Sequence, residues 1–180
     1  MDTDGHIREK EERTFSAADR IVAEVKNRTQ AAGKIILFGH SAGGQFVHRW
    51  ALLGGKKNVD VIAVANSGWF TMPDRDIDYP YGIKNVGITD EELGEAFAEP
   101  VILFMGEKDV ERKPPFRDTP EADAQGMNRM ERCTNYFRQC KAKAEELRVP
   151  FRWKLETVEG AAHQGVKMAE GAAAYIFGKS

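Results

Sequence analysis

Residues 34–44 read Lys34-Ile-Ile-Leu-Phe-Gly39-His-Ser41-Ala-Gly43-Gly44. The first half is a short apolar run, as expected for a buried parallel strand. The second half matches Gly-x-Ser-x-Gly, a pattern in which a sharp strand-to-helix turn presents a serine hydroxyl. We expect glycine at positions 39 and 43 because side chains there would collide with the neighbouring strand and helix. The stretch therefore predicts that Ser41 is a nucleophile.

The same alternation of strand and helix continues on both sides of this stretch. Before it, Ser16 and Asp19 resemble a helix N-cap with an acidic third position. Alternating strands and helices predict a mostly parallel sheet with helices on both faces, a three-layer α/β/α sandwich. The C-terminal ends of the strands then share one edge, where such sheets carry their sites. Apolar runs predict strands over residues 34–38, 59–65, 101–105 and 151–158, and helical spacing predicts helices over residues 16–30, 45–53, 128–148 and 166–177.

The sequence predicts a polar leader, residues 1–15, followed by a single domain, residues 16–180. Two long connections, 66–99 and 107–125, leave the C-terminal ends of strands, and long loops in a compact domain are often functional. In the first of them, Trp69 and Phe70 could line a substrate pocket beside the serine. They could equally pack the loop onto the body of the domain.

A serine nucleophile needs a base, and His163 is the best-placed histidine. It lies on a glycine-flanked loop after the last predicted strand, at the expected active edge. His48 lies two turns along the helix that follows Ser41, which favours a structural or surface role. His40 occupies the variable position of the motif and is expected to pack beside the serine, while His6 lies in the polar leader.

The acid that orients the base is expected just past the strand at 101–105. Asp109 lies a few residues beyond that strand, where its carboxylate could reach the histidine. Glu107 is nearer to the strand end and remains an alternative acid. An ordinary solvated loop acid is the third interpretation of both positions.

Three stretches together resemble the α/β-hydrolase family over nearly the whole chain. They are Gly-His-Ser-Ala-Gly-Gly-Gln-Phe at 39–46, Gly-Glu-Lys-Asp at 106–109 and the histidine loop at 160–165. The stretch at 39–46 is similar to the corresponding motif of esterase-like and polyester-depolymerase-like members. The resemblance implies a serine esterase without metal or organic cofactor, acting on a small-molecule ester, with Ser41, His163 and Asp109 as its triad and the Ala42 amide in its oxyanion hole.

Members of the family have several strands ahead of the nucleophile, whereas this sequence has room there for one helix. We therefore expect a truncated α/β-hydrolase fold with about four strands. The absent strands normally bring half of the oxyanion hole, and losing one donor costs about 10²–10³ in turnover. Gly68 or Trp69 is a candidate replacement. The alternative is a catalytically weak relative that acts as a binding or assembly module.

Truncation would leave the strand at 34–38 on the edge of the sheet with its apolar flanks uncovered. Exposed apolar edge strands pair with other chains. The sequence therefore predicts a homo-oligomer joined through this edge.

Composition narrows the remaining classes of function. The formal charge is -2 and the basic residues are scattered, which argues against a nucleic-acid partner. No apolar run is long enough to cross a bilayer and none resembles a secretory signal, so we expect no membrane partner and a cytoplasmic location. Cys133 and Cys140 lie about 10 Å apart along one predicted helix, so both are expected to be free thiols. No spacing indicates a metal site.

Overall fold

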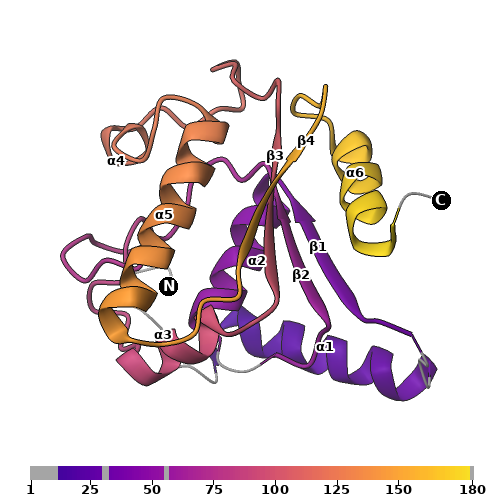
Figure 1. The fold of residues 1–180 in the computed structure, drawn as a ribbon. Coiled ribbons are helices and arrows are strands. Elements are labelled where there is room, and N and C mark those ends of the chain that lie inside the picture. The colour runs from indigo at the N-terminus through magenta and orange to yellow at the C-terminus, as the bar shows by residue number, and fades with distance from the viewer. Residues whose placement is uncertain (1–11, 30–32, 55–56, 179–180) are drawn as a thin grey trace.

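The computed structural model describes residues 12–29, 33–54 and 57–178 (Figure 1). Four parallel strands form one sheet in the order β1-β2-β3-β4. The strands are β1 (Ile36–His40), β2 (Val61–Ala65), β3 (Val101–Gly106) and β4 (Lys154–Val158), and the helices are α1 (Thr14–Thr29), α2 (Ala42–Leu53), α3 (Asp90–Phe97), α4 (Pro120–Asp123), α5 (Arg129–Leu147) and α6 (Gly165–Phe177).

The helices cover both faces of the sheet, which confirms the predicted three-layer α/β fold. Side chains of α1, α2, α3 and α5 share one hydrophobic cluster with one face of the strands. The residues of α6 form a second cluster with the opposite face, and Figure 1 shows α6 across the sheet from α5. Because all strands are parallel, their C-terminal ends lie at one edge, where the loops after β1, β3 and β4 meet.

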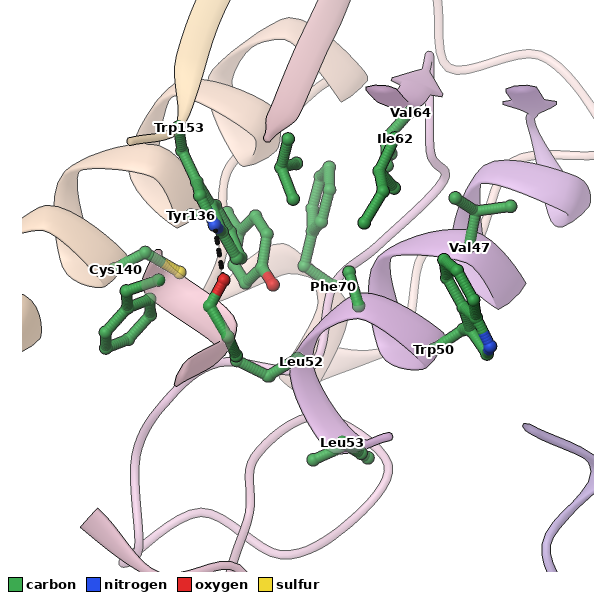
Figure 2. Close-up of a cluster of buried hydrophobic side chains, with 14 of the residues drawn as sticks. Val47, Trp50, Leu52, Leu53, Ile62, Val64, Phe70, Tyr136, Cys140 and Trp153 are labelled. Carbon is green, nitrogen blue, oxygen red and sulfur yellow. Dashed lines mark hydrogen bonds between the residues drawn. The ribbon is translucent and has the colours of Figure 1, made fainter. Parts of the chain in front are cut away.

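Aromatic packing fills the larger cluster (Figure 2). Phe70 stacks on Tyr136 of α5 with ring centroids 4.4 Å apart. The indole N–H of Trp153 donates to the carbonyl of Ala96, 2.9 Å away, so its polar atom is satisfied in the core. Truncating such a buried aromatic ring to alanine typically costs about 3–5 kcal/mol. This cluster therefore anchors the long connection after β2 to α5.

Some boundaries differ from those expected. The first helix begins at Thr14, and Ser16 lies inside it with its hydroxyl donating to the Arg13 carbonyl, so the predicted cap at Ser16 is wrong. Residues 1–11 of the predicted leader lie outside the described part. The expectation missed α3 and α4, because it treated both connections as loops. For α3 a signal was present, since Thr89 and Glu92 form a reciprocal capping box.

The two cysteines are free and buried on α5, in agreement with the prediction from their spacing. Burial raises the pKa of both thiols, because a thiolate there would lose its hydration. Neither sulfur is therefore activated as a nucleophile.

Candidate active site

Ser41 lies between β1 and α2 in a strained backbone conformation, with φ 55° and ψ −116°. Its amide donates to the carbonyl of Ala65 at the end of β2, and its carbonyl accepts the first helical bond from Gln45. Such strain costs about 1–3 kcal/mol and persists only where surrounding contacts impose it. The turn therefore presents the serine side chain at the C-terminal edge of the sheet.

The turn requires glycine at positions 39 and 44, whereas the sequence predicted positions 39 and 43. A Cβ on Gly39 would overlap the carbonyl of Gly43 and the side chain of Val47, as predicted. A Cβ on Gly43 would meet nothing within 4 Å, so the predicted collision there is wrong. The crowded position is Gly44, where a Cβ would lie 2.6 Å from Ser67 Oγ. The turn faces solvent at position 43, whereas position 44 faces the end of β2.

Gly44→Ala is expected to destabilise the protein, whereas Gly43→Ala is not. The new methyl at position 44 would also lie 2.9 Å from the Ala65 carbonyl, which belongs to the backbone and cannot rotate away. Overpacking of this kind costs about 1–3 kcal/mol. Gly43→Ala adds a methyl in open space inside a helix and can stabilise by up to about 1 kcal/mol. Urea unfolding of both variants measures the difference, and equal stabilities would contradict this account.

Ser41, His163 and Asp109 form a continuous chain of hydrogen bonds. The Ser41 Oγ lies 2.9 Å from His163 Nε2, and His163 Nδ1 lies 2.7 Å from Asp109 Oδ2. The neutral tautomer with its proton on Nδ1 satisfies both contacts, because Nδ1 then donates to the carboxylate and Nε2 accepts from the hydroxyl. The loops after β1, β3 and β4 thus bring together the three residues that the sequence singled out.

Asp109 is 3% exposed and has a second partner that sequence reasoning missed. Its Oδ1 accepts from Arg129 Nη1 at 3.1 Å, while its Oδ2 faces His163. Glu107, the alternative acid, points elsewhere, and its carboxylate accepts from the Gly160 amide at 2.7 Å. Glu107 therefore closes the histidine loop against the end of β3, and Asp109 is the acid in contact with the imidazole.

Asn66 is a further organising residue that sequence reasoning missed. It lies just after β2 with φ 45°, and it is buried. Its side-chain oxygen accepts from the Gly106 amide at 2.7 Å, and its amide nitrogen donates to the Ala162 carbonyl at 3.0 Å. Asn66 thus ties the end of β3 to the residue before His163. An asparagine at a strand end, a residue type that tolerates positive φ, was the available signal.

The other described histidines support the site as neutral rings. His40 packs beside His163 with ring centroids 4.7 Å apart, as expected. Burial, and secondarily the neighbouring imidazole of His163, lower the pKa of His40. His48 is fully buried; its Nδ1 faces the Gly44 carbonyl, and its Nε2 accepts from the Thr71 amide. Burial lowers the pKa of His48 well below its ordinary value, so the ring remains neutral. Its two contacts join α2 to the loop after β2.

Trp69 and Phe70, the two candidate substrate contacts, both pack the loop after β2 onto the body of the domain. Phe70 is fully buried in the core, so its ring does not line an open pocket in this structure. Trp69 is 7% exposed and packs against Tyr81, with the guanidinium of Arg49 4.9 Å above its ring. A substrate contact of Trp69 stays a prediction.

The amide of Ala42 is placed to serve as an oxyanion donor. Ala42 is the first residue of α2 and is exposed, and the first amides of a helix have no intrahelical acceptor. Its N–H is therefore free for an oxyanion beside Ser41. The carbonyl of Gly68 accepts from Arg132 at 2.7 Å, which pins the loop after β2 to α5. The role of Gly68 or Trp69 as second donor stays a prediction.

Comparison with solved structures identifies relatives of the whole arrangement. The chain is similar to poly(aspartic acid) hydrolase-1 from Sphingomonas sp. KT-1, with 32% identity and a TM-score of 0.90, over 98% of this chain and 68% of that one. The chain belongs to the α/β-hydrolase family. This α/β-hydrolase is also similar to the poly(3-hydroxybutyrate) depolymerase LpqC from Bordetella parapertussis, with 30% identity and a TM-score of 0.89. That match covers 99% of this chain and 61% of the depolymerase.

No protein-family model and no curated protein matches the sequence of this α/β-hydrolase. Within the described ranges, His, Cys, Asp and Glu side chains form no group of three or more that could hold a metal ion. In the same part of the chain, every helix is too short or too polar to cross a membrane.

Proposed function

We propose that this α/β-hydrolase is a serine carboxylesterase that works through an acyl-enzyme on Ser41. The supporting observation is the chain of contacts from the serine hydroxyl through His163 to a buried Asp109. This arrangement matches the geometry that activates a serine, in which the base contacts the nucleophile and is itself oriented by an acid. The strained backbone at Ser41 supports the same function, since strain of this kind clusters at active sites.

In the proposed reaction, His163 Nε2 takes the hydroxyl proton as Ser41 Oγ attacks the ester carbonyl. The tetrahedral oxyanion accepts a hydrogen bond from the N–H of Ala42, and Asp109 stabilises the imidazolium. The imidazolium then gives its proton to the departing alkoxide, which leaves as an alcohol. Water enters, loses a proton to His163, and attacks the acyl-enzyme. The second tetrahedral intermediate then releases the carboxylic acid and restores Ser41 with its proton.

The substrate class can be tested directly with three kinds of compound. Short-chain p-nitrophenyl esters report on ester cleavage as such, and we expect turnover of them. Oligomers of 3-hydroxybutyrate and poly(aspartic acid) then test whether the chain shares the polymer substrates named for its two relatives. A folded protein that hydrolyses none of the three would favour the alternative, a catalytically weak relative that acts as an assembly module.

We further propose that two copies associate through the β1 edge and the exposed apolar side chains of α1. In the described residues β1 pairs only with β2, and its side chains are mostly half-buried. Ile21 and Val25, one turn apart on α1, are 64% and 47% exposed. An edge strand pairs readily with a second copy of itself, and exposed apolar side chains mark such interfaces.

Light scattering is expected to give the mass of a dimer for the wild type and of a monomer for Ile21→Lys/Val25→Lys. Both positions are exposed, so the double variant is expected to unfold at nearly the wild-type temperature. Ala23→Lys/Asn27→Lys, on a face of the same helix away from Ile21 and Val25, is the control and is expected to remain a dimer. A monomeric wild type at micromolar concentration would contradict the proposal.

A further inference from the structure

We infer that Arg129 is the positioning residue of the triad acid, an inference that rests on the proposed function. Its side chain is almost fully buried beside Asp109, and Nη1 donates to Asp109 Oδ1 at 3.1 Å. The two oxygens of the carboxylate thus divide their partners, with one facing Arg129 and the other His163. Rotation of the carboxylate about its axis would break both contacts at once.

Buried charge gives the first reason for this role. Asp109 is 3% exposed, and an isolated carboxylate at that depth would be strongly disfavoured in its ionised form. In the resting site His163 is a neutral partner, because its Nε2 must be free to accept the serine proton. The guanidinium supplies the compensating positive charge in that state, and it cannot lose its own proton. Arg129 is therefore the charge partner of the buried carboxylate that accepts from His163 Nδ1.

The second reason is that the same guanidinium orients the loop that carries the acid. Arg129 Nη2 donates to the carbonyl of Pro115 at 3.1 Å, and the guanidinium lies 5.0 Å above the Phe116 ring. One rigid fork thus spans Asp109 and a residue six positions further along the loop. A lysine carries one compact ammonium group in place of the planar fork and could not make both contacts with this geometry.

The position of Arg129 on α5 supports a role outside the helix. It is the first helical residue after the cap Asn128, at the end where the helix dipole is positive. A cation at this end is unfavourable to the helix, so the stability of α5 does not account for it. The contact with Asp109 does. That mismatch between residue type and helix position was also the signal for Arg129 in the sequence.

The test compares Arg129→Met, Arg129→Lys and the matched control Arg112→Met. Arg112 contacts the same Phe116 ring at 4.9 Å, but its guanidinium binds Asp123 and the Met127 carbonyl instead of Asp109. For Arg129→Met we expect kcat on p-nitrophenyl esters to fall on the order of tenfold to a hundredfold with KM nearly unchanged. Arg129→Lys is expected to recover part of that loss, and Arg112→Met to retain nearly the wild-type kcat.

A second readout does not need turnover. The His163 Nδ1 proton, hydrogen-bonded to Asp109, is expected as a far-downfield proton resonance in the resting wild type, and Asp109→Asn removes it. Arg129→Met should shift or broaden this resonance, whereas Arg112→Met should leave it unchanged. An unchanged resonance and kcat in Arg129→Met would overturn the inference. If Arg129→Met alters the resonance but the wild type shows no esterase activity, the proposed function is overturned and the inference on Arg129 stands.

Thermal unfolding identifies any variant that loses the fold. Should Arg129→Met be unfolded, Arg129→Lys carries the comparison, because it retains the positive charge. A folded Arg129→Lys with wild-type kcat and an unchanged resonance would then overturn the inference.

Discussion

Ser41→Ala is expected to lower kcat/KM for p-nitrophenyl esters by about 10⁴-fold or more, because the acyl-enzyme can no longer form. The hydroxyl lies 2.9 Å from His163 Nε2, and Ser41 is only half-buried, so its loss leaves no cavity in the core. The variant is therefore expected to fold with wild-type stability. Stopped assays with the wild type and the variant, at matched protein concentration, measure the loss.

Ser67→Ala is the matched control for this prediction. Ser67 lies beside Gly44, the third residue after the nucleophile in the chain, but it is 1% exposed and its hydroxyl has no hydrogen-bond partner in the described structure. Its loss is expected to leave turnover nearly unchanged. A fluorophosphonate should label the wild type and Ser67→Ala once each and leave Ser41→Ala unlabelled, as read by intact mass. Equal turnover by Ser41→Ala and the wild type would contradict the nucleophile assignment.

Asp109→Asn is expected to lower kcat by about 10⁴-fold while the fold is retained. The reason lies in the contact on the other side of the carboxylate. Arg129 only donates, so the amide oxygen of the new asparagine is drawn to Arg129. The amide NH₂ group then faces His163 Nδ1 and forces the proton onto Nε2. In that tautomer the imidazole cannot accept the proton of Ser41.

Glu107→Gln separates the two acids that the sequence left open. Glutamine retains an acceptor oxygen for the Gly160 amide, so the histidine loop is expected to stay closed. We expect kcat for this variant within about threefold of the wild type, as for a surface change without a catalytic contact. Steady-state kinetics of both variants give the comparison. A larger loss in Glu107→Gln than in Asp109→Asn would reverse the assignment.

Much of the fold followed from local patterns. The four strands were predicted from short apolar runs, and the observed strands overlap each of them. The order of strands and helices predicted a parallel sheet, because a strand can return in parallel only through a crossover. The capping box of α3 was overlooked within a connection rich in turn residues. The observed β1 lies two residues further along than predicted and includes Gly39 and His40, because pairing with β2 outweighs local propensity.

The chain order of serine, acid and histidine allowed the sequence by itself to single out Ser41, Asp109 and His163, because each follows a predicted strand at the same edge. The sequence favoured Asp109 but left Glu107 as an alternative acid, since both carboxylates lie within reach of that edge. Only the tertiary structure decided which of them faces the imidazole. It also revealed Arg129 and Asn66, whose partners lie 20 and 96 residues away in the chain. Local patterns can mark such a residue as unusual but do not identify its partner, because the contact arises only when distant loops pack together.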